Sequence, residues 1–203
     1  MKSRCQSSDF QTFIMIGAFI MQTLDAIFTR KTIRSYTDQA VEKEKLETIA
    51  QAGNQAAIAG KLEFVVITNR NILDQIQREA KAFFLRSGVE KLVMLASNPN
   101  YEVLHNAPAG IAVVISDTTD PHASKMNAEN TGCAVQNMLI AATELGLGSC
   151  FAESGSVAFT NPAIKDAIGI SNDKTVSAIV TLGYTENTTP AVKRNTDNIT
   201  WCE

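Results

Sequence analysis

Histidine and cysteine are scarce in this chain of 203 residues. The two histidines, His105 and His122, stand apart and fit no metal-binding pattern such as HExxH. The four cysteines are widely spaced and include no CxxC pair: Cys5, Cys133, Cys150 and Cys202. We therefore expect surface or loop histidines, no metal site, and reduced thiols in a cytoplasmic protein.

An excess of positive charge is also missing. Eighteen basic and 21 acidic residues give a formal net charge of -3 and a pI of about 5.5. A dedicated nucleic-acid-binding protein usually has a basic face and a high pI, so we expect no nucleic-acid partner. Hydrophobic residues make up 45% of the chain, which favours a packed core over disorder.

The longest apolar run, FIMIGAFIM at residues 13–21, is too short for a membrane span, which needs about 20 residues. We expect no membrane partner, and we divide the chain into an N-terminal extension at 1–20 and one domain at 21–203. We expect the extension to be a buried or partner-packed helix, and two alternatives stay open. It could be a secretory signal, because Lys2 and Arg4 precede the run, or translation could begin at Met21.

Several catalytic motifs are absent as well. There is no Walker loop and no GxSxG nucleophile elbow. The pair Gly146-Leu147-Gly148 lacks the third glycine of a dinucleotide fingerprint and follows a helical pattern, so we interpret it as a helix end. The sequence therefore lacks the motifs that P-loop hydrolysis, acyl transfer or zinc catalysis would require.

Apolar periodicity predicts helices near residues 24–28, 41–52, 72–83, 89–96, 127–145 and 162–168. Clustered β-branched and apolar residues predict strands at 63–68, 112–116 and 175–182. Loops are expected at 97–106 and 117–124, and a polar, irregular tail from Gly183. Helices and strands alternate without strict βαβ order, which predicts an α+β domain with a mixed sheet.

What the chain does contain is a basic cluster near its start: Arg30, Lys31, Thr32 and Arg34. Forked guanidinium donors, an ammonium group and a hydroxyl within a short reach suit a phosphate monoester. A solvated run of charge is the alternative. A second basic pair, Lys193-Arg194, lies in the tail.

Three stretches resemble the FMN-dependent nitroreductase family: MQTLDAIFTRKTIRSY at 21–36, HNAPAGIAVVISD at 105–117 and NTGCAVQNMLIAATELGLGSCFAES at 130–154. The first is similar to the opening helix and flavin-phosphate motif of that family, and the last to its long central helix. The resemblance implies a nitroreductase-like FMN-binding domain at 21–203, with a mixed central sheet flanked by helices. It also implies an intertwined homodimer with FMN bound at the subunit interface.

The resemblance assigns roles to individual residues. Arg30, Lys31 and Thr32, with Lys193 and Arg194, would hold the FMN phosphate, and Arg34 would lie near the pyrimidine edge of the flavin. Phe151, Ala152, Glu153 and Ser154 would run along the flavin ring. Glu153 and Ser154 are the catalytic candidates, through their backbone N–H groups or the Glu153 carboxylate.

The implied activity is an NADH- or NADPH-dependent oxidoreductase that reduces nitroaromatics, quinones or similar conjugated acceptors by ping-pong transfer. Reductive dehalogenation, flavin processing and a non-catalytic flavin-binding module are alternatives. The family pattern is not met everywhere. Residues 56–64 lack the asparagine that normally contacts flavin, and Asn130 or Glu129 stands where an acidic residue often opens the central helix.

Overall fold

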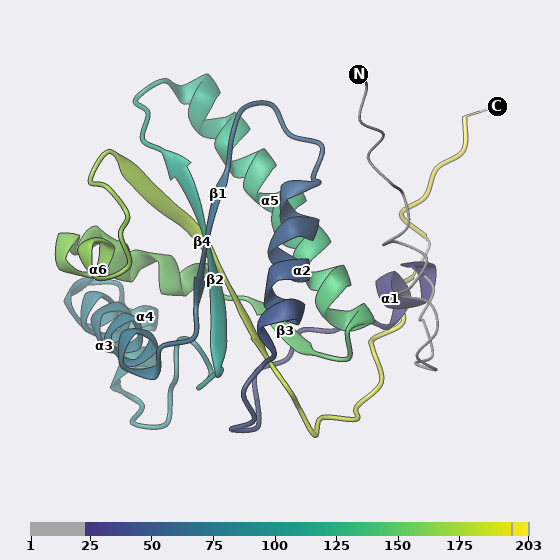
Figure 1. The fold of residues 1–203 in the computed structure, drawn as a ribbon, viewed down its shortest axis with the longest axis horizontal. Helices are drawn as coiled ribbons and strands as arrows, with labels where there is room; N and C mark the ends of the chain where they lie inside the picture. The colour runs from purple at the N-terminus through teal and green to yellow at the C-terminus, as the bar shows by residue number, and fades with distance from the viewer. Residues whose placement is uncertain (1–22, 196, 203) are drawn as a thin grey trace, which may run out of the picture.

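The computed structural model describes residues 23–195 and 197–202, which form one sheet between two helical layers (Figure 1). The strands are β1 (Glu63–Ile67), β2 (Ala109–Ser116), β3 (Gly148–Phe151) and β4 (Lys174–Gly183). They lie in the order β1-β2-β4-β3, and each neighbouring pair is antiparallel. The parallel component of the expected mixed sheet is an isolated bridge between Thr32 and Ser149.

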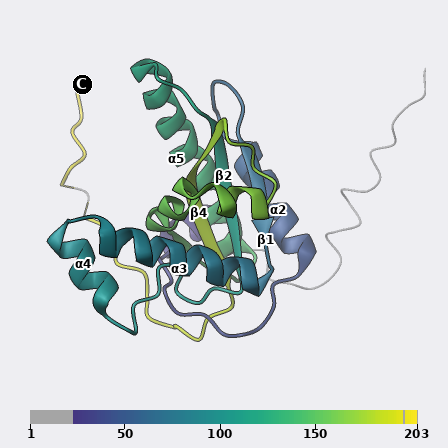
Figure 2. The ribbon, with the colours of Figure 1, turned by 90° about the vertical axis from the view of Figure 1, so that its left-hand side faces the viewer.

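Helices cover both faces of this sheet (Figures 1 and 2). One face carries α2 (Lys43–Asn54) and α5 (Pro121–Glu144), with α1 (Thr23–Thr29) packed outside α5. The other face carries α3 (Arg70–Arg86) and the 3-10 segment η2 (Glu153–Thr160), with α4 (Glu90–Ser97) and α6 (Pro162–Ala167) packed against α3. The predicted α+β class, with helices flanking a central sheet, is confirmed.

The hydrophobic core is divided by the sheet into two clusters. Because side chains alternate along a strand, Ile111 and Val113 of β2 pack toward α2 and α5, whereas Ala112 and Val114 pack toward α3 and η2. The strand is buried on both faces, which explains its uninterrupted apolar sequence.

The long helix α5 begins earlier than the sequence pattern predicts. The Asp120 carboxylate accepts a 3.0 Å hydrogen bond from the His122 amide, and Pro121 occupies the first turn, where its missing N–H costs nothing. The loop predicted at 117–124 is therefore wrong from Pro121 onward. The helix ends as predicted: Gly146 has φ 73°, and the Leu147 amide donates to the Ala142 carbonyl at 2.8 Å.

Strand β3 was not among the predicted strands, because four residues are too few to show a pattern. It lies against Ile33, and a Cβ on Gly148 would come within 2.9 Å of the Ile33 Cγ2 atom. Glycine is therefore required for this close approach. The expected extension at 1–20 lies outside the described residues, and no described helix is long and apolar enough to cross a membrane.

Candidate active site

Strand β3 brings the basic cluster to the segment expected along a flavin ring. Thr32 forms the parallel bridge to Ser149, and the Ile33 amide donates a 2.9 Å hydrogen bond to the Ser149 carbonyl. Ile33 is only 2% exposed and anchors this segment in the core, whereas its neighbours Thr32 and Arg34 are exposed. Since Phe151 ends the same strand, the two predicted halves of the site are adjacent.

Two arginines lie close to the buried Cys150 of β3. Burial raises the pKa of the Cys150 thiol, and the nearby charges of Arg34 and Arg30 act in the opposite direction. Within the described part of the chain, no ion pair engages Arg30 or Arg34. Their positive charge is therefore available to an anionic ligand.

Lys31 contacts the C-terminal tail. Its Nζ donates to the Asn187 carbonyl at 2.8 Å and to the Asn187 Oδ1 at 3.3 Å, and it also contacts the Thr189 carbonyl. Lys193 and Arg194 are exposed farther along this tail. Among the described residues, no hydrogen bond or ion pair joins either of them to Arg30, and the structure does not show them at the cluster.

Tyr36 connects the cluster to the central strand β4. Its hydroxyl lies 2.9 Å from the Thr181 Oγ1 and donates to the Ile33 carbonyl at 2.9 Å. Burial raises the pKa of Tyr36 above its usual range, so the phenol is neutral at physiological pH. Thr181 pairs with Cys150 across the sheet, so one network holds the cluster against β3 and β4.

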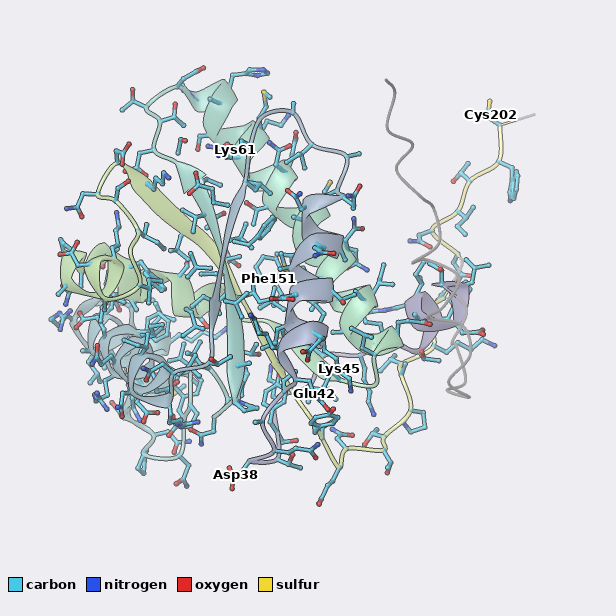
Figure 3. The ribbon with its side chains drawn as sticks, viewed as in Figure 1. Asp38, Glu42, Lys45, Lys61, Phe151 and Cys202 are labelled. Carbon is cyan, nitrogen blue, oxygen red and sulfur yellow. The ribbon has the colours of Figure 1, made fainter. Side chains whose placement is uncertain are left out.

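Phe151, labelled in Figure 3, is the last residue of β3, pairs with Val180 of β4 and is 42% exposed. Ala152 is buried, and its amide donates to the Ile179 carbonyl at 2.8 Å. Glu153 is exposed and opens η2, followed by the half-buried Ser154. The first N–H groups of a helical turn have no partner within it, so this segment offers backbone donors beside an exposed aromatic ring.

Arg34 also lines a cleft of about 540 Å³ that sequence reasoning missed. Residues of the loop at 98–106 also line this cleft, among them the half-buried His105. His105 lies in a loop, as expected, but its place beside Arg34 comes from tertiary structure. The local signal in the sequence is the His-Asn-Ala-Pro pattern at 105–108, which carries no information about Arg34.

Asn130, which stands where the family pattern often has an acidic residue, contacts the loop near Ala59. Asn130 of α5 donates from Nδ2 to the Ala59 carbonyl at 2.6 Å and accepts from the Ala59 amide at 3.2 Å. An amide side chain can do both, whereas a carboxylate only accepts. Asn130 therefore suits this loop better than the acidic residue of the family pattern.

The model of the nitroreductase family matches residues 27–184. A Haemophilus influenzae protein provisionally named an NAD(P)H nitroreductase is 31% identical over 172 residues, which cover 80% of this chain and 88% of that protein.

Solved structures show the same fold. A Bacteroides fragilis nitroreductase with bound FMN is similar with a TM-score of 0.80 and 23% identity, covering 90% of this chain and all of that one (100%). A Desulfitobacterium hafniense nitroreductase with bound FMN gives a TM-score of 0.76 at 23% identity, covering 89% and 98%. With its α+β fold and a family match that spans most of the described domain, the chain belongs to the nitroreductase family.

Proposed function

We propose that this protein is an FMN-dependent NAD(P)H oxidoreductase that reduces nitroaromatic, quinone or similar conjugated acceptors. The observation that carries the proposal is the pairing of residues 32–33 with Ser149, which joins a basic cluster to an exposed aromatic and backbone-donor segment. The bound FMN of the similar solved structures supports it. So does the NAD(P)H nitroreductase name of the Haemophilus relative.

The residues present fit FMN. Arg30 and Arg34 carry charge that no described carboxylate neutralises, and Thr32 adds an exposed hydroxyl. Ser149 beside them has a buried Oγ with no hydrogen-bond partner among the described residues. We assign Arg30 and Thr32 to the phosphate, with Lys31, Lys193 and Arg194 as further candidates.

FMN, when bound, supplies the hydride and electron chemistry. Arg34 would stabilise negative charge that develops at the flavin pyrimidine on reduction. Phe151 and Ala152 would line the ring, and the N–H groups of Glu153 and Ser154 would donate hydrogen bonds to it. One cleft that receives donor and acceptor in turn gives ping-pong kinetics.

We also infer an intertwined homodimer. Helix α1 exposes Leu24 (63%) and Phe28 (74%), and the tail exposes Trp201 (82%). Large apolar side chains that gather on the outer surface mark contact sites between proteins, and a second copy of this chain is the partner that the family membership favours. A cytoplasmic location is part of the proposal, since Cys133, Cys150 and Cys202 are free thiols.

The test is direct. The purified protein, incubated with FMN and desalted, should retain flavin absorption, and NADH or NADPH should bleach that absorption without oxygen. Nitroaromatics or quinones should then restore it. A protein that binds no FMN contradicts the proposal, and bound flavin that neither nicotinamide reduces indicates a binding module instead.

A further inference from the structure

Two consecutive residues at the cleft opposite Arg34 have a left-handed backbone. His105 has φ 56° and Asn106 has φ 55°. This region is uncommon for residues other than glycine, although asparagine and histidine enter it more often than most. Such conformations cost free energy, persist only where surrounding contacts hold them, and cluster at functional sites.

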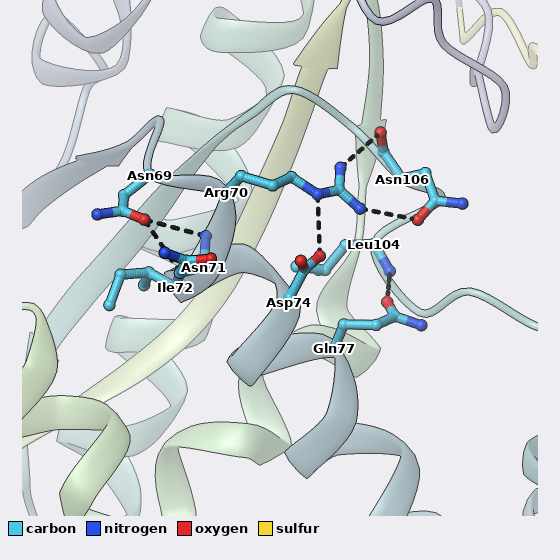
Figure 4. Close-up of polar contacts among 8 residues, drawn as sticks. All are labelled: Asn69, Arg70, Asn71, Ile72, Asp74, Gln77, Leu104 and Asn106. Carbon is cyan, nitrogen blue, oxygen red and sulfur yellow. Dashed lines mark hydrogen bonds and ion pairs between the residues drawn. The ribbon is translucent and has the colours of Figure 1, made fainter.

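Those contacts come from one side of α3 (Figure 4). Arg70 donates to the Asn106 Oδ1 at 3.1 Å and to the Asn106 carbonyl at 3.4 Å, and its Nε is 2.9 Å from the Asp74 carboxylate. The Gln77 Oε1 accepts from the Leu104 amide at 2.7 Å. The spacing of Arg70, Asp74 and Gln77 places them on one helix face.

A further residue on the same face of α3 contacts an earlier part of the loop. Lys81, one turn after Gln77, donates from Nζ to the carbonyls of Asn98 and Tyr101 at 3.0 and 3.3 Å. Arg70, Gln77 and Lys81 therefore hold the loop at 98–106 mainly by its backbone. We call this set the α3 clamp. Its contacts engage the Asn106 side chain but not those of Tyr101, Glu102 or His105.

The loop presents polar groups to the cleft. The lining residues include Tyr101, Glu102, His105 and Asn106 of the loop, together with Arg34. A volume of about 540 Å³ is within the usual range for small-molecule sites. Because the lining includes the donors of Arg34, Tyr101 and His105, the cleft suits a small ligand with oxygen acceptors.

The inference rests on the proposed flavin-dependent reduction. We propose that His105 is a specificity-determining residue that donates a hydrogen bond to a nitro or carbonyl oxygen of the electron acceptor in this cleft. Arg70 is a positioning residue that acts through the backbone of Asn106. The neutral imidazole has one N–H group, which is the donor in this role. Burial, followed by the charge of Arg34, lowers the pKa of His105, while a hydrogen bond with the Glu102 backbone acts in the opposite direction.

The experiment measures equilibrium binding to the oxidised, FMN-loaded protein, where no turnover occurs. The probe is 4-nitrobenzamide, followed by the change in flavin absorption, and benzamide is the control ligand without a nitro group. His105→Gly removes the imidazole and tolerates the left-handed backbone. We expect a roughly three- to tenfold higher Kd for 4-nitrobenzamide, the loss of one neutral hydrogen bond, and little change for benzamide.

Arg70→Gln should weaken 4-nitrobenzamide binding in the same direction, with Arg78→Gln, an exposed arginine of α3, as the matched control. FMN affinity, titrated separately, should change less than about twofold in His105→Gly, because the hydrogen bond that is removed goes to the electron acceptor and not to FMN. If Arg70→Gln does not fold, His105→Gly still decides the question.

Unchanged 4-nitrobenzamide binding in His105→Gly overturns the assignment while the proposed function stands. An equal loss of FMN and 4-nitrobenzamide affinity also overturns it, because His105 would then serve the cofactor or the fold. A wild-type protein that takes up no FMN overturns the proposed function and this assignment with it.

Discussion

The amide of Ile33 donates a hydrogen bond of 2.9 Å to the carbonyl of Ser149. This contact joins the segment that follows α1 to a short edge strand that is distant in the sequence. It places Arg30 and Arg34 beside Cys150 and brings both arginines to the start of the 151–154 segment. The site therefore depends on a backbone contact as much as on its charged side chains.

Arg30→Ala should weaken FMN binding roughly ten- to a hundredfold, because a hydrogen bond to a charged group is worth about 1.5–3 kcal/mol. The measurement is quenching of FMN fluorescence on titration with protein. Arg78→Ala, which removes an exposed arginine from α3, should leave the Kd unchanged. An unchanged Kd for Arg30→Ala would mean that the cluster is a solvated surface.

Lys31→Met should loosen the tail, because the Lys31 ammonium holds the backbone of Asn187 and Thr189. We expect faster proteolysis in the segment after Thr189, with a smaller loss of FMN affinity than Arg30→Ala causes. Limited proteolysis followed by mass spectrometry locates the cleavage. A loss of FMN affinity equal to that of Arg30→Ala, with a tail of normal resistance, would place Lys31 on the phosphate instead.

Asn130→Asp should lower the free energy of unfolding by about 1–3 kcal/mol, because the side chain of residue 130 is buried and a carboxylate there cannot donate to the Ala59 carbonyl. Urea unfolding followed by circular dichroism measures the change. Asn172→Asp makes the same substitution at an exposed position and should have a small effect. Equal stability of the two variants would show that the Asn130 contact contributes nothing.

Phe28→Glu should shift the protein toward the monomer, since it places a charge on the exposed apolar surface of α1. Light scattering after size-exclusion chromatography gives the mass at several concentrations. Met94→Glu is the control, because Met94 is similarly exposed (71%) on α4, beyond the opposite face of the sheet. A wild-type protein that is monomeric at all concentrations would contradict the dimer.

The free energy of unfolding should also respond to His105. Burial and Arg34 lower the pKa of His105 in the folded state below its ordinary value of 6.5, so the unfolded state binds more protons just below that pH. The corresponding stability is present above pH 6.5 and is lost as the pH falls through the folded-state pKa.

His105→Gly should therefore flatten the decline in stability below pH 6.5, measured by urea unfolding at several pH values. His122→Gln, a change at an exposed histidine, provides the comparison. A profile for His105→Gly that parallels the wild-type curve would show that another group causes the decline.

Much of the secondary structure follows from local sequence. The predicted helix at 41–52 corresponds to α2, and the glycine end of α5 is where the sequence places it. These features depend on apolar periodicity and on glycine at a left-handed position, which act over a few residues. The start of α5 was misplaced because the apolar pattern begins after the first turn, while the Asp120 cap and Pro121 fix the true start.

The sequence by itself determined the α+β class, the basic cluster and the family resemblance, because these depend on residue types at short spacing. Only the tertiary structure decided that Lys31 contacts the tail and that Asn130 supports the loop at 59. It also brought His105 to the cleft of Arg34. These contacts join residues far apart in the chain, and their partners are chosen by the packing of α3, α5 and the sheet rather than by any local preference.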